Sequence, residues 1–197
     1  NMIVVAGPSG SGKTTLIHML LKEYSDAIFS ISHTTRPRRE DEVNGMDYYF
    51  ISEKEFLEKI EKNEFAEWAK VHQHYYGTTF KEVENKIKTG KDILVDLDIQ
   101  GVRSFKKQFP DALYILIVPP TMERLKARLL GREKKLSDNV KKRLDIAREE
   151  MGNYNMFDYV IINDKLDRAY FVLNSIFTAF QNSIAKKEAF LKNLLEC

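Results

Sequence analysis

The chain has 197 residues, and its 31 lysines and arginines nearly balance 29 aspartates and glutamates, which gives a formal net charge of +2. This balance provides no broad field that would attract nucleic acid or an anionic membrane, and no apolar run approaches the roughly 20 residues that cross a bilayer. The single cysteine, Cys197, is the last residue and cannot form an internal disulfide, so we expect a cytoplasmic protein that binds neither nucleic acid nor membrane.

Short aliphatic runs alternate with longer amphipathic stretches along most of the chain. The sequence predicts a buried strand over residues 3–6, a helix over 14–24, and further strands over 28–31, 93–97, 113–118 and 159–162. A helical pattern follows most of these strands. Because strands that alternate with helices form parallel sheets with both faces covered, the pattern predicts an α/β fold.

Two segments interrupt this alternation. Residues 33–80 are polar and aromatic, with short strands predicted over 48–50 and 65–71 and a capping box, Ser52 to Glu55, that opens a helix between them. Residues 121–150 are rich in charge and form two helical stretches with Gly131 between them, the first of which Thr121 can cap. We therefore predict a single domain over 1–197. Its core (1–32, 81–120 and 151–197) carries a small mixed α/β insert (33–80) and a helical insert (121–150).

The segment between the first strand and the first helix, Gly7-Pro-Ser-Gly-Ser-Gly-Lys13-Thr14, fits the phosphate-loop pattern G-x-x-x-x-G-K-[ST] without a mismatch. Its glycines let backbone N–H groups converge on phosphate oxygens at the positive end of a helix dipole. Lys13 is expected to reach the β- and γ-phosphates of ATP, and the Thr14 hydroxyl is expected to bind Mg²⁺. The fold prediction is therefore a three-layer P-loop NTPase core with a parallel sheet. The predicted ATP-binding residues of this loop are Gly7, Pro8, Ser9, Gly10, Ser11, Gly12, Lys13, Thr14 and Thr15.

Three arginines and several hydroxyls gather in Ser32-His-Thr-Thr-Arg36-Pro-Arg-Arg39, after the strand predicted over 28–31. Guanidinium groups fit a phosphate or a carboxylate in a bidentate manner. Taken alone, the segment favours a solvated basic loop over an anion site. The segments that follow it change this balance.

These are Glu42-Val-Asn-Gly45-Met-Asp-Tyr48, Glu64-Phe-Ala-Glu67-Trp68-Ala69, Tyr75-Tyr76-Gly77-Thr78, Asp96-Leu-Asp98-Ile-Gln100-Gly101 and Tyr159-Val-Ile-Ile-Asn163-Asp164. In this order, and over about residues 2 to 170, they resemble guanylate kinase. The resemblance implies phosphoryl transfer from ATP to GMP with Mg²⁺, a GMP-binding insert at 33–80 and a lid at 121–150. The chain departs from the family where Glu133-Lys134-Lys135 follow Arg132 in place of a second glycine, which leaves the hinge geometry of the lid open.

The resemblance also implies how a GMP acceptor would be held. Its phosphate would be bound by guanidinium groups and phenol hydroxyls, its N1–H and amine by Glu67, its O6 by Ser32 and Thr78, and the amine again by Asp98. A buried carboxylate suits guanine because adenine presents an acceptor and no amine there, which would leave the carboxylate unpaired. The residues implied for the phosphate are Arg36, Arg39, Tyr48 and Tyr76.

Asp96 and Asp98 follow the apolar run 93–95, as the acid of a Walker B segment does. Alternate residues of a strand share a face, so both carboxylates can line one cleft. Asp96 is expected to serve Mg²⁺, partly through water, and Asp98 the acceptor, with the reverse assignment left open.

In guanylate kinases the lid supplies arginines to the migrating phosphoryl group, and Arg132 and Arg143 match that pattern, whereas Arg124 and Arg128 are expected to be structural or solvent-facing. Asn163 is expected near the adenine. Phosphoryl transfer requires positive charge around the group rather than a side-chain nucleophile. The predicted catalytic residues are Lys13, Arg36, Arg132 and Arg143.

Two alternatives remain for the function: a guanylate-kinase-like module that binds without catalysis, and a kinase for a different nucleotide or phosphorylated acceptor. The complete phosphate loop argues against the module. The apolar face Leu166, Tyr170, Leu173, Phe177, Phe180 and Ile184 is expected to pack on the core, with a dimer seam as the alternative. The predicted partners are therefore ATP, GMP and dGMP as a further acceptor, for a monomer or a homodimer.

Overall fold

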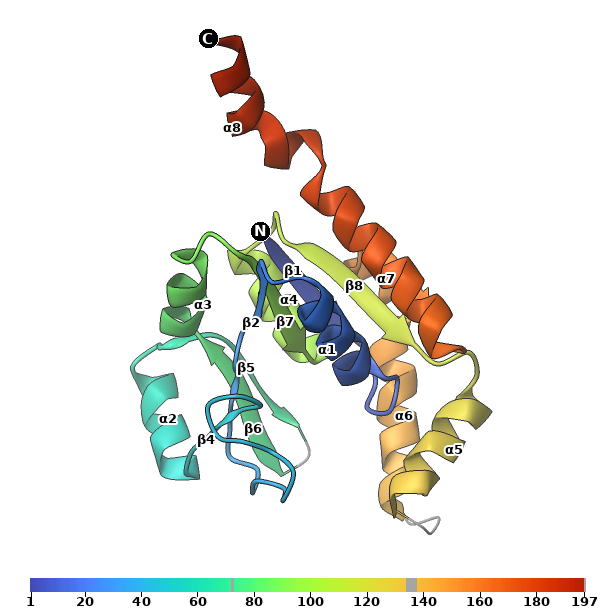
Figure 1. Ribbon diagram of the computed structural model, residues 1–197. Helices are drawn as coiled ribbons and strands as arrows, with labels where there is room; N and C mark the ends of the chain where they lie inside the picture. Colours follow the sequence, from blue (N-terminus) through green and yellow to red (C-terminus); the bar gives the residue numbers. More distant parts are fainter. Residues whose placement is uncertain (72, 134–137, 197) are drawn as a thin grey trace.

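The computed structural model of the protein describes residues 1–71, 73–133 and 138–196, without the side chains of residues 132, 133, 138 and 139. The main sheet is parallel and has the strand order β2-β7-β1-β8-β9 (Figure 1). Its strands are β1 (Met2–Ala6), β2 (Ala27–Phe29), β7 (Asp92–Leu97), β8 (Leu113–Val118) and β9 (Tyr159–Ile162). The predicted parallel sheet is confirmed.

The strand predicted over 28–31 is shorter than expected and ends at Phe29. Ser30 still donates its N–H to the carbonyl oxygen of Leu94 in β7, at 2.8 Å. The N–H of Ile31 donates instead to the side chain of Glu82, at 2.9 Å. The chain therefore leaves the main sheet at Ile31 and turns toward the first insert.

Side chains of β1 alternate between the two faces of the sheet, as a strand requires. Ile3 and Val5 pack with α1 (Lys13–Glu23) and α7 (Leu166–Gln181), which cover one face. Val4 and Ala6 pack with α4 (Ile99–Gln108) and with Val83 of α3 (Phe80–Ile87) on the other. The predicted three-layer core follows from this arrangement, and the phosphate loop emerges at the carboxyl end of its central strand.

A second, four-stranded sheet has the order β4-β3-β6-β5 and lies beside the phosphate-loop end of the core (Figure 1). Its elements are β3 (His33–Thr34), β4 (Tyr49–Phe50), β5 (Phe65–Val71), β6 (His74–Thr79) and the helix α2 (Glu53–Glu61). The capping box is confirmed: the Ser52 hydroxyl accepts the N–H of Glu55, whose carboxylate accepts the N–H of Ser52.

The helical insert is a pair of packed helices, α5 (Met122–Glu133) and α6 (Asp138–Gly152). Leu125, Leu129, Val140 and Ala147 form its own small core. Thr121 accepts the N–H of Arg124 at 3.2 Å, which confirms the predicted cap. Gly131 does not separate two helices as predicted, because α5 continues through it to Glu133. The departure from the family pattern at 134–135 lies outside the described residues, as does Cys197.

The apolar face predicted from Leu166 to Ile184 extends over two helices and is only partly buried. Leu173 and Phe177 are fully buried on the core, and Tyr170 and Phe180 pack against the same cluster. Leu166 is 40% exposed and Ile184 is 75% exposed. The prediction that the face packs on the core is therefore wrong for its first and last residues. The reason at Ile184 is that α7 ends at Gln181, and α8 (Ile184–Leu195) runs away from the core (Figure 1). Among the described residues, no helix combines the length and apolar character that a membrane span requires.

Candidate active site

The phosphate loop joins β1 to α1, with Lys13 as the first residue of the helix. Gly7, Gly10 and Gly12 all have positive φ angles, of 141°, 87° and 96°. A Cβ at Gly7 would lie 2.1 Å from the carbonyl oxygen of Ile117 in β8, so no other residue fits there without displacing the sheet. The loop is thereby held open around the N-terminus of α1, where free N–H groups and the helix dipole favour an anion.

Replacing Gly7 with alanine is expected to strain the backbone by about 1–3 kcal/mol, before the contact with Ile117 is counted. The melting temperature should fall, and KM for ATP should rise because the loop can no longer close around the phosphates. Gly152→Ala is the matched control, since a Cβ there has no neighbour within 4 Å. Thermal melting and ATP kinetics of both variants test this, and a Gly7→Ala protein with unchanged KM for ATP contradicts it.

Two residues from outside the phosphate loop hold its backbone by hydrogen bonds. The side-chain amide of Asn163 donates to the carbonyl oxygen of Ser11 at 2.7 Å. Arg128 of α5 donates to the same oxygen at 3.4 Å and to the carbonyl oxygen of Asn163 at 2.7 Å. Arg124 and Arg128 were expected to be structural or solvent-facing. Arg128 therefore has a structural role, and Arg124 is exposed to solvent. The sequence linked neither Arg128 nor the Asn163 amide to the loop.

Helix α6 also contacts the phosphate loop. Arg143 donates from Nη2 to the Ser9 hydroxyl at 2.6 Å. This contact brings a guanidinium group to the phosphate loop. Arg132 lies in the last turn of α5, and its side chain is outside the described part of the structure.

Carboxylates line the floor next to Lys13, whose ammonium group donates to the carbonyl oxygens of Gly7 at 2.7 Å and Pro8 at 3.4 Å. Burial raises the pKa of Asp96, which Lys13 lowers in part and Asp98 raises again. Burial also raises the pKa of Asp98, although backbone N–H groups at the start of α4 lower it. The negative pair at the end of β7 therefore lies within electrostatic range of the phosphate-loop lysine.

Glu150 of α6 also faces this floor, a position that the sequence did not single out. Burial raises its pKa to about 7; Lys13 lowers it and Asp98 raises it. Arg143, Ala147 and Glu150 fall four and three residues apart, so they share the helix face that is directed toward the phosphate loop. The spacing was visible in the sequence, but which face of α6 meets the core was not.

Arg36, Tyr48 and Tyr76 come together on the second sheet, where the phosphate of an acceptor was expected. The guanidinium carbon of Arg36 lies 5.6 Å from the Tyr48 ring centre, and the two tyrosine rings are 5.9 Å apart. Glu42, a motif residue without a predicted role, pairs with Arg36 at 2.5 Å and with Arg39 at 3.9 Å. Burial lowers the pKa of Arg36, but Glu42 and Tyr76 outweigh it, so the pKa is raised overall and the group stays charged.

Glu67, Ser32 and Thr78 form a buried polar group at the junction of this sheet with the core. Glu67 is only 5% exposed, and the Ser32 and Thr78 hydroxyls are 2.9 Å apart. Burial raises the pKa of Glu67 to about 8, against hydrogen bonds from Thr78 that lower it. A Cβ at Gly101 of α4 would lie 2.6 Å from Glu67 Oε2, so any larger residue there would displace the Glu67 carboxylate from its present position. Glu67 is therefore an interior residue of the fold and not a surface acid.

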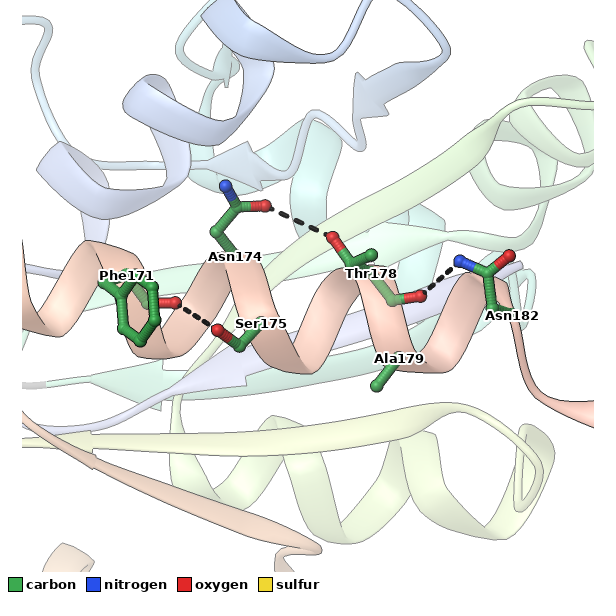
Figure 2. Close-up of a pocket in the computed structure, with 6 residues that line it drawn as sticks. All are labelled: Phe171, Asn174, Ser175, Thr178, Ala179 and Asn182. Carbon is green, nitrogen blue, oxygen red and sulfur yellow. Dashed lines mark hydrogen bonds between the residues drawn. The ribbon is translucent and has the colours of Figure 1, made fainter.

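A shallow hollow of about 410 Å³ lies far from these residues, along the outer face of α7 (Figure 2). Six residues line it: Phe171, Asn174, Ser175, Thr178, Ala179 and Asn182. The Ser175 hydroxyl donates to the carbonyl oxygen of Phe171, and the Asn182 amide to that of Thr178, at 2.8 Å each. Asn174 and Thr178 are bonded instead to the side chains of Glu23 and Tyr24 at the end of α1. The polar groups of the hollow therefore have partners within the protein and do not converge on a ligand.

A phosphate loop at the carboxyl end of a parallel sheet, beside a second group of arginine, tyrosine and glutamate side chains, is the arrangement of a P-loop phosphotransferase. The family model for guanylate kinase matches residues 1–180. The chain belongs to the guanylate kinase family.

Individual relatives agree with this assignment. The chain is 40% identical over 187 residues to a guanylate kinase of Thermotoga maritima, which covers 95% of this chain and 90% of that protein. It is 43% identical over 189 residues to a guanylate kinase of Dechloromonas aromatica, with 96% and 94% covered. The crystal structure of guanylate kinase from Anaplasma phagocytophilum matches with a TM-score of 0.78 at 30% identity, over 94% of this chain and 89% of that one.

Proposed function

We propose that this protein transfers the γ-phosphoryl group of ATP to GMP, giving ADP and GDP. The observation that carries the proposal is the buried Glu67 carboxylate beside the Ser32 and Thr78 hydroxyls, a pattern of acceptors and donors that complements guanine. The phosphate loop and the family membership support the transfer from a nucleoside triphosphate. We place the reaction in the cytoplasm, where both nucleotides are made and used.

In this proposal the ATP phosphates lie on the phosphate loop and the insert at 33–80 binds GMP. The GMP phosphate would lie among Arg36, Arg39, Tyr48 and Tyr76. The clustering of Arg36 with both phenol rings supports this position, as does Glu42, which orients the guanidinium without neutralising the whole group. Asp98 would contact the guanine amine, which its electrostatic proximity to Glu67 supports.

The helical insert at 121–150 would act as the lid. The bond from Arg143 to Ser9 supports this role, because it brings the insert to the mouth of the loop. Asn163 would then bind ATP indirectly, by holding the Ser11 carbonyl of the loop. All of these residues belong to one chain, so a monomer can contain the complete site.

Mg²⁺ fits the floor of the site. Burial and the neighbouring Asp98 both raise the pKa of Asp96, against Lys13, and a divalent cation beside the carboxylate would favour its ionised form. The Thr14 hydroxyl and the Asp96 carboxylate are hard oxygen donors, which Mg²⁺ prefers, with water as further ligands. When bound, the cation would neutralise charge on the β- and γ-phosphates.

The side chains of the protein would position the two phosphates and stabilise the negative charge of the transition state. Lys13 would hold the phosphoryl oxygens of the donor, and Arg36 would aim the GMP phosphate in line with them. Arg143, with Arg132, would surround the group as its negative charge spreads over the equatorial oxygens. Closure of the lid would exclude water, which otherwise competes with GMP as the acceptor.

A coupled ADP-release assay that offers GMP, dGMP, AMP, CMP and UMP in parallel tests the proposal. GMP is expected to be preferred over AMP by about 10⁴-fold in kcat/KM, because AMP would leave Glu67 without donors. The reaction without an acceptor measures the background hydrolysis of ATP. A preference for AMP or UMP would overturn the guanine assignment, and ADP release that no acceptor stimulates would overturn the kinase assignment.

A further inference from the structure

Glu82 is a buried carboxylate at the place where the GMP-binding insert joins the core. It lies in the first turn of α3, is 7% exposed, and is not among the residues that would touch either nucleotide. Burying a carboxylate is costly unless its oxygens are bonded, so its partners indicate what it does. These partners lie in the segment between β2 and β3, in β4, and in α3 itself.

One oxygen of Glu82 accepts the N–H of Ile31 at 2.9 Å and lies 3.6 Å from the ammonium group of Lys86. The other accepts the Tyr49 hydroxyl at 3.5 Å. The Ile31 bond is the shortest of the three and involves a buried backbone N–H, which has left the ladder of the main sheet. Glu82 is therefore the group that satisfies Ile31 at the point where the chain leaves the core.

Glu82 is also joined to the point where the chain returns to the core. Its own N–H donates to the hydroxyl of Thr79, which caps α3, at 3.2 Å. Thr79 follows Thr78, and Ile31 precedes Ser32. The Ser32 and Thr78 hydroxyls, 2.9 Å apart, complete a closed ring of contacts that passes through Glu82.

We propose that Glu82 is a positioning residue for guanine recognition, which holds the Ser32 and Thr78 hydroxyls together at the height of the guanine O6. This inference rests on the proposed function, because it takes that hydroxyl pair to face O6. The two hydroxyls are 46 residues apart in the sequence, with Ser32 directly before β3 and Thr78 in β6. The backbone segments are paired in the adjoining ladder of β3 and β6, whose last pair is His33 with Gly77. One residue beyond this pair, the hydroxyl contact and the Glu82 ring continue the connection between them. Loss of the ring would let the pair separate and would weaken GMP binding while ATP binding is unaffected.

Comparing Glu82→Asp with Glu82→Gln shows whether the length of the Glu82 side chain or its negative charge matters for GMP binding. Aspartate keeps the charge opposite Lys86 but withdraws the oxygen from Ile31 by one methylene, whereas glutamine keeps an oxygen within reach of Ile31 and loses the charge. We expect Glu82→Asp to raise KM for GMP about tenfold, with KM for ATP and kcat within about twofold of wild type. Glu82→Gln should stay within about threefold. Glu84→Gln, on an exposed position of the same helix, is the control.

A double-mutant cycle with Ser32→Ala tests whether Glu82 acts through the hydroxyl pair. The double variant Ser32→Ala/Glu82→Asp should have a KM for GMP close to that of Ser32→Ala alone, because the pair is already lost. Additive effects would overturn the inference, as would Glu82→Gln being as impaired as Glu82→Asp. A lower melting temperature with unchanged KM for GMP would show a purely structural role. A wild-type enzyme that does not prefer GMP would instead overturn the proposed function.

Discussion

Replacing Lys13 with methionine is expected to lower kcat by about a thousandfold or more while the fold is retained. Its ammonium group donates to the loop carbonyls of Gly7 and Pro8 and lies within electrostatic range of Asp96. In the reaction it would be the fixed positive charge nearest the β- and γ-phosphates, where charge develops. Methionine has similar length and fills the same space, so the variant removes the charge and leaves the packing. Single-turnover kinetics with saturating ATP and GMP measure the loss in the chemical step.

The control for this variant is Lys22→Met on the same helix, because Lys22 is exposed and distant from the loop. It should keep wild-type kinetics. Circular dichroism and thermal melting of both variants show whether the fold is intact. A Lys13→Met protein that is folded and retains more than about a tenth of the wild-type kcat would remove Lys13 from the catalytic role that we assign to it.

The phosphate loop and the main sheet could be predicted from sequence because their signals are local. The loop pattern occupies eight consecutive residues, and each strand is a short aliphatic run whose burial follows from its composition. The predicted bounds of β8 and β9 match the structure, since turn residues flank both runs. The end of β2 was missed, because it depends on Glu82, which lies about 50 residues further along the chain.

Contacts between elements could not be predicted from one sequence. Arg128 had the spacing of a surface residue, yet its guanidinium holds two backbone carbonyls behind the phosphate loop. Glu42 was part of a motif without a role, and it pairs with Arg36 because the loop 36–42 folds back on itself. Such residues acquire their function from the register in which elements dock, and a periodic pattern does not specify this register.

The end of α7 illustrates the same limit. Periodicity continued from Leu166 to Ile184, but no glycine or proline marks the break at Asn182. The Asn182 N–H and side-chain amide both donate to the carbonyl oxygen of Thr178, which closes the last turn of the helix. The apolar periodicity therefore predicted buried residues correctly only along the part of the helix that lies against the core.

Replacing Glu67 with glutamine is expected to reduce the preference for GMP over AMP by about a hundredfold or more. Guanine directs two donors, N1–H and the amine, at this carboxylate. Glutamine can accept only one of them, and its NH₂ group would face the other donor in a site that excludes water. Glu61→Gln, on the exposed face of α2, is the control and should discriminate as wild type does. Full discrimination by Glu67→Gln would contradict the base-recognition argument.

The same substitution should change how activity and stability depend on pH. Burial raises the pKa of Glu67 from 4.5 to about 8, so the group is largely protonated in the free protein at pH 7. GMP needs the ionised form, and kcat/KM for GMP should therefore rise with pH up to about 8, in wild type more than in Glu67→Gln. Because the folded state retains a proton that the unfolded state has lost, the free energy of unfolding without nucleotide should fall between pH 5 and pH 8. The slope from this group is at most about 1.4 kcal/mol per pH unit. In Glu67→Gln the contribution of this group to the decline in unfolding free energy should disappear. That result would show that guanine selectivity is maintained at the expense of stability.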